Sequence, residues 1–187
     1  MRCFVTGCAG FVGSNLVERL LQEGHEVVGY DNLSSGREEF LLDAQERPAF
    51  KLVRGDLLDS QALAAAMKGC EFVYHIAANA DVRFGPNAPR RDLEQNVLAT
   101  SNVLEAMRAN AILKIVFSST GSIYGEPHVF PTPENAPFPV QTSFYGASKL
   151  AAEGLIQAYC ESFDFQAWIF RFVSILGERY SHGHVFD

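Results

Sequence analysis

Long apolar stretches and closely spaced cysteines are both missing from this sequence of 187 residues. No apolar run reaches the roughly 20 residues that a helix needs to span a bilayer. The chain begins almost directly in an apolar strand pattern, which leaves no room for a signal peptide. The cysteines have neither CxxC nor metal-ligand spacing, so we expect free thiols in the cytoplasm at Cys3, Cys8, Cys70 and Cys160. These absences predict a soluble cytoplasmic protein without a membrane segment.

Positive charge is scarce as well. The sequence has 15 lysines and arginines against 22 aspartates and glutamates, which gives a net charge of −7. Binding to nucleic acid or to an anionic membrane requires a basic face, so we expect neither partner. What remains is an ordinary globular composition, with 48% hydrophobic residues and a length suited to one domain over residues 1–187.

Apolar patterns of two kinds alternate along the chain. Extended patterns cover residues 3–5, 26–30, 50–53, 71–76, 114–117 and 166–172, and helical patterns cover 12–20, 38–44, 61–67, 92–110 and 143–162. This alternation favours a parallel sheet with helices on both faces. We therefore predict an α/β fold with a doubly wound parallel sheet of six strands. Residues 81–91 and the proline-rich residues 127–139 are expected to be loops, the second a rigid active-site rim.

A glycine-rich turn joins the first predicted strand to the first helix. Gly7, Gly10 and Gly13 have the spacing GxxGxxG, rather than the GxGxxG of most dinucleotide-binding folds. Gly7 permits a sharp turn, Gly10 lets the backbone approach a pyrophosphate, and Gly13 lets the helix pack closely on the sheet. The helix N-terminus adds N–H donors and a positive dipole. Alone the pattern is a weak signal, because glycine turns between strands and helices are common.

Acidic residues follow the second and third predicted strands. Asp31 lies about 20 residues past the glycines, where a carboxylate can accept hydrogen bonds from both adenosine ribose hydroxyls and repel a 2′-phosphate. This position favours NAD over NADP. The alternative is that Asp31 only caps a turn with Asn32 and Ser34. Asp56 is suited to bind an adenine amino group, or equally to be a turn residue, whereas Asp59 is expected to cap the next helix.

A candidate group for proton transfer lies late in the chain. Tyr145 and Lys149 are spaced i, i+4 on one predicted helix and therefore share a face. An ammonium beside a phenol stabilises the phenolate, which would lower the pKa of Tyr145 from about 10 and make it a usable general base. Thr120, at the end of the fifth strand, would bridge to a substrate hydroxyl. Without the glycine turn upstream, such a pair would be read as a solvated helix face.

The histidines give a weaker signal. His75 lies in the apolar run of the fourth strand, and we expect a core histidine rather than a catalyst. His182 and His184 form a His-Gly-His pair without nearby carboxylate or cysteine partners. Zinc sites require such further ligands. We therefore expect no metal site and interpret this pair as part of a packing loop.

The motifs together resemble the extended short-chain dehydrogenase/reductase family, in its NAD-dependent epimerase/dehydratase branch. The resemblance covers the whole chain in family order and spacing, and within the branch it is strongest to UDP-glucose 4-epimerases and related nucleotide-sugar epimerases. The matching segments are Thr6-Gly7-Cys8-Ala9-Gly10-Phe11-Val12-Gly13, Asp31-Asn32-Leu33-Ser34-Ser35-Gly36, Gly55-Asp56-Leu57, His75-Ile76-Ala77-Ala78, Asn96-Val97-Leu98-Ala99-Thr100-Ser101-Asn102, Ser118-Ser119-Thr120 and Tyr145-Gly146-Ala147-Ser148-Lys149.

This resemblance implies a Rossmann fold, tightly held NAD and a nucleotide-sugar substrate, most simply a UDP-sugar. It implies that Tyr145 takes a proton from a sugar hydroxyl while hydride passes to NAD, and that the keto-sugar turns over before the hydride returns. Thr120 would hold the sugar hydroxyl, and Lys149 would bind the nicotinamide ribose. The implied cofactor contacts are Gly7, Gly10, Phe11, Val12, Gly13, Asp31, Asn32, Ser34, Ser35, Gly36, Asp56, Leu57, Ile76, Ala77, Ala78, Ala80, Asn96, Ser118, Tyr145, Lys149, Phe172 and Val173.

The resemblance also implies a homodimer. Members of the family commonly pair the two long helices, here residues 92–110 and 143–162, with those of a second copy as a four-helix bundle. The small or apolar residues compatible with such an interface are Ala99, Val103, Ala106, Ala151, Ala152 and Leu155.

Three departures from the family pattern bear on function. Nucleotide-sugar 4,6-dehydratases need an Asp-Glu pair after the catalytic threonine, and Gly121 and Ser122 stand there instead, which disfavours a dehydratase. Ser174 replaces an asparagine that commonly contacts the substrate pyrophosphate. Family members also continue past residue 187 into a small substrate-binding domain, so we expect a truncated fragment. The alternatives are another dehydratase or reductase of the family, or a non-catalytic NAD-binding module.

Overall fold

Six parallel strands form one sheet within residues 1–80, 85–138 and 140–180, the parts of the chain that the computed structural model describes. The strands are β1 (Arg2–Thr6), β2 (Glu26–Asp31), β3 (Phe50–Arg54), β4 (Phe72–His75), β5 (Lys114–Thr120) and β6 (Gln166–Phe172). Their order in the sheet is β3-β2-β1-β4-β5-β6. The order runs outward in both directions from the β1–β4 pair, which confirms the predicted doubly wound architecture.

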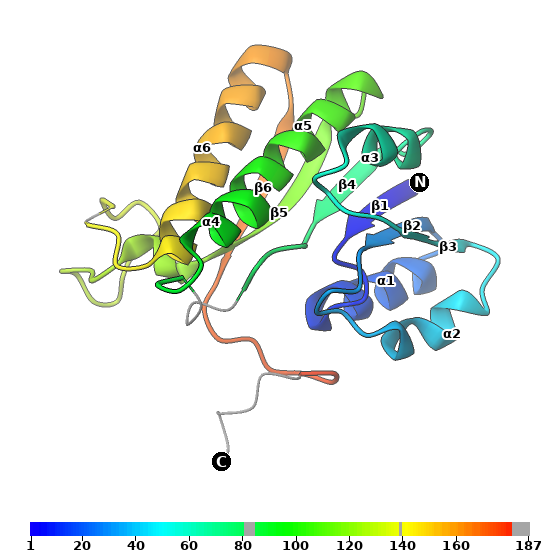
Figure 1. The fold of residues 1–187 in the computed structure, drawn as a ribbon, viewed down its shortest axis with the longest axis horizontal. Coiled ribbons are helices and arrows are strands. Elements are labelled where there is room, and N and C mark those ends of the chain that lie inside the picture. Colours follow the sequence, from blue (N-terminus) through cyan, green and yellow to red (C-terminus); the bar gives the residue numbers. More distant parts are fainter. Residues whose placement is uncertain (81–84, 139, 181–187) are drawn as a thin grey trace.

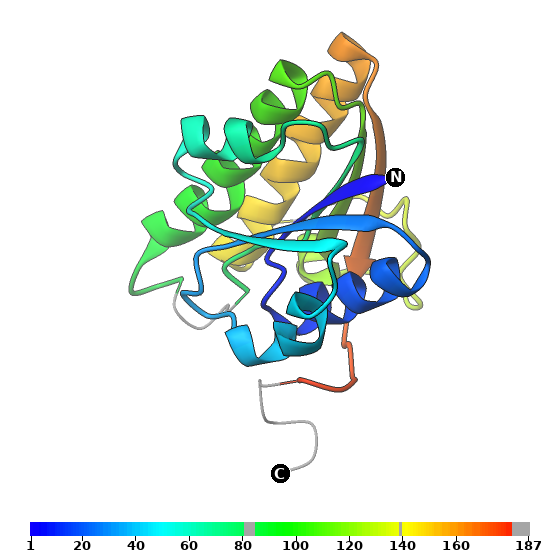
Figure 2. The same cartoon turned by 90° about the vertical axis from the view of Figure 1, so that its right-hand side faces the viewer.

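Helices cover both faces of this sheet (Figures 1 and 2). Helices α1 and α2 pack on one face beside β1, β2 and β3, whereas α3, α5 and α6 lie side by side on the other. The helices are α1 (Phe11–Gln22), α2 (Leu42–Gln45), α3 (Ser60–Ala66), α4 (Pro89–Asp92), α5 (Ala99–Ala109) and α6 (Phe144–Phe163). They are joined by the 3₁₀ segments η1 (Glu38–Leu41) and η4 (Gly121–Tyr124) and the π-helical segment η3 (Leu93–Leu98).

Alternation of side chains along the strands divides the core into two layers. Phe4 and Val28 pack in the layer that includes residues of α3, α5 and α6, whereas Val5 and Val27 pack in the layer that includes residues of α1. Successive side chains of a strand point to opposite faces of the sheet. Strands buried on both faces therefore have continuous apolar runs, and this is the pattern that predicted them.

Two boundaries differ by three residues from the sequence prediction, and the others by fewer. The helical region expected from residue 92 begins at Pro89, because proline lacks an N–H group and suits the first position of a helix. Strand β5 extends beyond residue 117 to Thr120, because β6 pairs with it along its length and places Phe172 opposite Thr120. Asp81 and Pro139, which limit the two predicted loops, lie outside the described residues.

The prediction of a dimer interface is wrong for most of the residues it names. An amphipathic helix turns its apolar stripe to the core of its own chain, and the structure places that stripe against the sheet. Ala151 is exposed on α6 and Leu155 is half-buried. The residues buried within their own chain are Ala99, Val103, Ala106 and Ala152.

No described helix combines the length and the apolar character needed to cross a membrane. All four cysteines are free thiols, and only Cys160 is partly exposed. Burial raises the pKa of the Cys70 thiol to about 11. Since the thiolate is the nucleophilic form, Cys70 is unreactive at neutral pH.

Candidate active site

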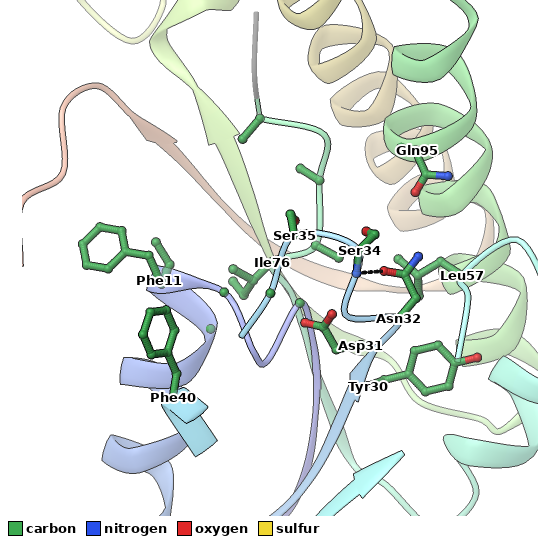
Figure 3. Close-up of a pocket in the computed structure, with 18 of the residues that line it drawn as sticks. Phe11, Tyr30, Asp31, Asn32, Ser34, Ser35, Phe40, Leu57, Ile76 and Gln95 are labelled. Atoms are coloured by element: carbon green, nitrogen blue, oxygen red, sulfur yellow. Dashed lines mark hydrogen bonds between the residues drawn. The ribbon is translucent and has the colours of Figure 1, made fainter. Parts of the chain in front are cut away.

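A cavity of about 480 Å³ opens at the carboxyl ends of β1, β2 and β4. It lies beside the β1–β4 pair, where the strand order reverses and where doubly wound sheets bind their ligands. In Figure 3, Phe11 and Phe40 lie on one side of the cavity, and Gln95 of η3 lies on the other. The volume falls in the usual range for small-molecule sites, about 300–1,000 Å³.

The glycine turn after β1 forms the floor of this cavity. Gly7 has a φ of +68°, and a Cβ there would lie 2.7 Å from the Cα of Ala77. A Cβ on Gly13 would lie 2.0 Å from the carbonyl oxygen of Gly7. The turn therefore admits no side chain at either position, and Gly13 brings α1 against the turn itself. The first N–H groups of a helix have no intrahelical acceptor, and Phe11, Val12 and Gly13 of α1 all line the cavity.

Asp31 forms the turn contacts that the sequence offered as one alternative, and it also lies in the cavity wall, as the other alternative requires. Its Oδ2 accepts a 2.9 Å hydrogen bond from the backbone N–H of Ala9, and its Oδ1 accepts one of 2.8 Å from that of Leu33. The residue thus caps its own turn and fixes the glycine turn. It also lines the cavity, where Figure 3 shows its carboxylate beside Asn32 and Ser34. The side chain of Asn32 accepts a 3.0 Å hydrogen bond from the N–H of Ser34, so this loop is held as a short polar turn.

Most of the implied cofactor contacts line this one cavity. The predicted residues found in its wall are Gly7, Gly10, Phe11, Val12, Gly13, Asp31, Asn32, Ser34, Ser35, Gly36, Leu57, Ile76, Ala77, Ala78, Ala80 and Val173. The predicted residues that do not line it are Asp56, Asn96, Ser118, Tyr145, Lys149 and Phe172. Lining residues that the sequence analysis missed as cofactor contacts are Tyr30, Phe40, Gly55, Gln95, Ser174, Ile175 and Tyr180.

A simple signal would have found some of the missed residues. Tyr30 and Gly55 are the immediate neighbours of Asp31 and Asp56 at the carboxyl ends of β2 and β3. Ser174 and Ile175 follow directly after β6, whose carboxyl end lies at the same edge of the sheet. In parallel sheets, that edge is where ligands bind. Phe40 had no such signal, because it does not directly follow a strand. Only the folded chain brings it to the cavity.

Asp56 is a turn residue. Its Oδ1 accepts a 2.9 Å hydrogen bond from the N–H of Leu58, and its Oδ2 accepts one of 3.2 Å from the amide of Asn32. Of the two alternatives, the structure therefore favours the turn, and Asp56 lies beside the cavity wall instead of in it. Asp59 accepts a hydrogen bond from the N–H of Ala62 and caps α3, as predicted.

Asn96 joins parts of the scaffold. It is buried on η3, and its Oδ1 accepts a 2.8 Å hydrogen bond from the backbone N–H of Asn79. Its Nδ2 donates to the carbonyl of Asn79 and, at 2.9 Å, to the hydroxyl of Ser148 on α6. The amide is thus committed to neighbours within the chain, so Asn96 connects the segment after β4 with α6 one residue from Lys149.

The two hydroxyl groups predicted for proton transfer lie together. Tyr145 and Thr120 share a side-chain hydrogen bond, and Thr120 also caps η4 by accepting a 3.1 Å hydrogen bond from the N–H of Ser122. Ser143 caps α6 by accepting from the N–H of Gly146, which fixes Tyr145 in the first turn of that helix. The end of β5 and the start of α6 therefore position this pair.

The pKa of Tyr145 differs from the sequence prediction. Burial raises it above the ordinary value, the hydrogen bond with Thr120 lowers it in part, and the charge of Asp92 raises it. The predicted lowering by Lys149 is wrong for this arrangement, because the ammonium is engaged elsewhere. Nζ of Lys149 donates a 2.6 Å hydrogen bond to the carbonyl oxygen of Ser118 and lies 4.4 Å from the centre of the Phe117 ring.

The segment that follows β6 closes one side of the cavity. It runs from residue 173 to Tyr180 and lies against α1 (Figure 1, red). The amide of Asn15 donates a 3.0 Å hydrogen bond to the carbonyl of Glu178, and Arg179 forms an ion pair with Glu18. The rings of Tyr180 and Phe11 meet edge to face at 5.4 Å. This wall therefore depends on contacts between the two ends of the described chain.

In the described parts of the chain, no three histidine, cysteine, aspartate or glutamate side chains are grouped so that they could hold a metal ion. His182 and His184, interpreted above as part of a packing loop, lie outside the described residues.

Comparison with known proteins agrees with this geometry. A UDP-glucose 4-epimerase of Mycolicibacterium smegmatis is 41% identical over 167 residues, covering 88% of this chain and 53% of the relative. The crystal structure of a UDP-galactose 4-epimerase has a TM-score of 0.89 and 42% identity, covering 98% of this chain and 59% of that one. The UDP-glucose 4-epimerase of Thermus thermophilus in complex with NAD has a TM-score of 0.83 and 38% identity, covering 91% and 54%.

The chain spans about half the length of the curated relatives it matches. The family model for the NAD dependent epimerase/dehydratase family matches residues 3–187. The match begins in the first strand and includes the glycine turn, the residues that line the cavity and the helix that carries Tyr145 and Lys149. This chain therefore belongs to the NAD dependent epimerase/dehydratase family.

Proposed function

We propose that residues 1–187 are the NAD-binding domain of a nucleotide-sugar epimerase, with a UDP-sugar as substrate. The observation that carries the proposal is the cavity at the β1–β4 switch point, built on a turn that admits no side chain at Gly7 or Gly13. The names of the relatives, UDP-glucose and UDP-galactose 4-epimerase, support the substrate class.

NAD fits the donors and acceptors of this cavity. The backbone of the glycine turn and the N-terminus of α1 suit a pyrophosphate, which binds to N–H groups and to the positive end of a helix dipole. The carboxylate of Asp31 suits ribose hydroxyls and disfavours a 2′-phosphate. Ile76, Ala77 and Ala78 offer a wall of small and apolar groups after β4. When bound, NAD would supply a reversible acceptor for hydride.

The residues near Thr120 supply the proton chemistry. Tyr145 would accept the proton of a sugar hydroxyl, and Thr120 would hold that hydroxyl beside the phenol. Lys149, whose ammonium is held at the carbonyl of Ser118, would bind the nicotinamide ribose. Gly121 and Ser122 of η4 carry no carboxyl group, so the site lacks the acid and base that elimination of water would need at these positions.

Two further features complete the proposal. We propose that the protein acts in the cytoplasm, since its cysteines are free thiols. We also propose a homodimer that contacts its partner through the outer surfaces of α5 and α6, where Ala151 and Leu155 remain partly accessible. The molar mass in solution, measured by light scattering with an Ala151→Arg variant as comparison, tests the dimer.

Isothermal titration of NAD and NADP tests the cofactor directly. The wild type is expected to bind NAD more tightly than NADP. Asp31→Asn keeps the size of the side chain and removes its charge, so NAD affinity should fall about tenfold to a hundredfold, the value of one charge-assisted hydrogen bond. Asp59→Asn, at the cap of α3, is the matched control and should change neither affinity.

Three results would contradict the proposal: no binding of NAD, equal binding of NAD and NADP, or equal effects of the two substitutions. The substrate class has its own assay, in which a UDP-sugar is added to the NAD-loaded protein. Reduction of the nicotinamide, followed by its absorbance, is the expected result for an epimerase that oxidises its sugar transiently.

A further inference from the structure

A second buried carboxylate lies next to the proton-transfer residues, and the proposed mechanism does not use it. Glu153 of α6 is 1% exposed and follows Lys149 by one helical turn. Its Oε1 accepts a 2.5 Å hydrogen bond from the hydroxyl of Ser119, and its Oε2 accepts one of 2.9 Å from Nη2 of Arg171 on β6. A buried charge is strongly unfavourable unless it is paired and hydrogen-bonded, and Glu153 is both.

Lys149 is likewise a buried charged residue, with fewer charged partners than Glu153. It is 2% exposed, and its ammonium lies against a backbone carbonyl and an aromatic ring, the groups of Ser118 and Phe117. Ser118 and Ser119 are consecutive residues of β5, so the ammonium and the carboxylate of Glu153 reach the same strand from adjacent turns of α6. Burial lowers the pKa of Lys149 to about 7, and the charge of Glu153 acts against that effect.

The other titratable groups around this pair come from each neighbouring element. His75 of β4 is affected by Lys149, Arg171 of β6 pairs with Glu153, and Tyr124 of η4 interacts with Arg171. Tyr145, one turn before Lys149 on α6, is affected by Asp92 of α4. The Lys149 charge depresses the pKa of His75, which burial already lowers to about 3, so this imidazole is neutral. Among these groups, the carboxylate that acts on Lys149 is that of Glu153.

We propose that Glu153 is a positioning residue whose negative charge, one turn away on α6, increases the fraction of Lys149 that is protonated at neutral pH. The inference rests on the proposed function, because a protonated Lys149 is the stronger hydrogen-bond donor to the nicotinamide ribose of bound NAD. The pKa of about 7 already includes the effect of Glu153, so without this carboxylate a larger fraction of the buried amine would be neutral at neutral pH.

Arg171 extends the role of Glu153 to the loop beside the site. Its Nη1 donates hydrogen bonds of 2.5 Å to the hydroxyl of Tyr124 and 2.7 Å to the carbonyl of Glu134. Its guanidinium also lies 5.3 Å from the centre of the Phe138 ring. The Glu153 carboxylate thus anchors the arginine that holds the proline-rich loop. Removal of Glu153 alone leaves a partly buried arginine without its carboxylate partner, so the test requires a second variant that removes both charges.

The four lysines of the sequence make the proposal directly measurable. They are Lys51, Lys68, Lys114 and Lys149, and the first three are exposed. Labelling lysine with ¹³C at the ε carbon gives one NMR signal for each, and the Lys149→Arg variant assigns the fourth. The titration midpoint of Lys149 is expected to fall by about one pH unit or more in Glu153→Gln, because loss of a neighbouring opposite charge shifts a pKa by that amount.

Three comparisons separate an electrostatic role from a purely structural one. Glu153→Asp retains the charge and should restore most of the midpoint. The double variant Glu153→Gln/Arg171→Met removes both charges and should also lower the midpoint, even if Glu153→Gln alone does not fold. Glu105→Gln, on an exposed carboxylate that binds Arg108 and Tyr159, is the matched control and should leave Lys149 unchanged.

An unchanged Lys149 midpoint in both Glu153→Gln and the double variant would overturn the proposal. So would an equal fall in Glu153→Asp, because that variant keeps the charge. The measurement uses neither substrate nor NAD. Failure of the proposed function would therefore appear in the NAD titration, and failure of this inference would appear in the lysine spectrum.

Discussion

Thr6 and His75 stand opposite each other in the register of β1 and β4 and share a 2.8 Å hydrogen bond between Oγ1 and Nδ1. The hydroxyl of Thr6 also accepts hydrogen bonds from the N–H groups of Ile76 and Ala77, each at 3.1 Å. A hydroxyl oxygen has two acceptor lone pairs. Thr6 must therefore donate its own proton to His75, and Nδ1 of the imidazole is the acceptor.

The direction of the next bonds follows from this one. Since Nδ1 accepts, the proton of the neutral imidazole is on Nε2, which donates a 3.0 Å hydrogen bond to the hydroxyl of Thr100. Thr100 in turn donates at 2.6 Å to the carbonyl of Asn96. The chain of hydrogen bonds joins the strand before the glycine turn to α5 and η3. His75 is a buried core histidine, as expected, and it also fixes the spacing of these elements.

A neutral His75 predicts a specific dependence of stability on pH. Burial holds its pKa at about 3, below the ordinary value of about 6.5 in the unfolded chain. The unfolded state therefore binds more protons between these values, so stability is complete above the unfolded pKa and falls as pH decreases. From this group alone, the free energy of unfolding should be about 2 kcal/mol lower at about pH 5 than at about pH 7.

Urea unfolding of wild type and His75→Asn at these two pH values measures the effect. The variant should be less stable at neutral pH, because the hydrogen-bond chain is broken, but its stability should change less with pH. His25→Asn, outside this hydrogen-bond chain, is the control and should keep the wild-type dependence. Parallel pH dependences in wild type and His75→Asn would show that this histidine is not the source.

A methyl group on Gly13 is predicted to damage the cofactor site. Its Cβ would lie 2.0 Å from the carbonyl oxygen of Gly7, so the N-terminus of α1 would have to move away from the turn. We expect Gly13→Ala to lose about 1–3 kcal/mol of stability, as for other overpacked positions, and at least tenfold in NAD affinity. Gly154→Ala on α6 is the matched control, because a Cβ there meets no atom within 4 Å.

Gly154→Ala should raise stability by about 0.5–1 kcal/mol, because alanine is the better helix former. Thermal unfolding and NAD titration of both variants provide the comparison. Wild-type affinity in Gly13→Ala would show that the close contact between α1 and the glycine turn does not matter for binding.

Removal of one hydroxyl group separates catalysis from binding. Tyr145→Phe should lower turnover of the nucleotide sugar about 10²- to 10⁴-fold, the usual contribution of a general base, while NAD affinity changes little. Tyr159→Phe is a matched control on the same helix, since its hydroxyl binds Glu105 at the surface. Rates of nucleotide-sugar turnover, measured for the wild type and for both variants, test this prediction. Equal rates in Tyr145→Phe and wild type would remove the phenol from the mechanism.

Asn96→Ala tests whether Asn96 is scaffold or ligand. The substitution leaves the partly buried N–H of Asn79 without its 2.8 Å acceptor and Ser148 without a donor. Such unsatisfied groups cost about 1–3 kcal/mol each, so thermal stability should fall clearly. Asn102→Ala removes a single hydrogen bond to Leu57 and is the comparison. If NAD affinity falls strongly while stability does not, Asn96 is a cofactor ligand.

The sequence was most informative where function requires a local pattern. The three glycines and Asp31 identified the cavity, because a turn that admits no Cβ can be built from few residue types. Lys149 shows the limit of this reasoning. Its i, i+4 spacing from Tyr145 indicated one helix face, but the partner of its ammonium is the carbonyl of Ser118, on a strand far back along the chain. No local pattern encodes such a contact.

The same limit explains the dimer surface and the missed cavity residues. An alanine stripe on α5 can pack either against a partner subunit or against the sheet of its own chain. The packing of α5 on β4 and α3 shows that it does the second. Phe40 and Tyr180 reach the cavity through folding of distant segments. Their positions depend on tertiary structure, which residue type and spacing do not specify.

The segment at residues 173–180 has a consequence for how the protein is made. It forms one wall of the cavity and bonds to α1 through Asn15 and Glu18, residues that leave the ribosome long before it. When the nascent chain has emerged only as far as α6, the glycine turn is already outside the ribosome, but β6 and the wall beyond it have not yet emerged. The cavity is thus among the last features of the described chain to be completed during translation, although the glycine turn that forms its floor is among the first segments to be made.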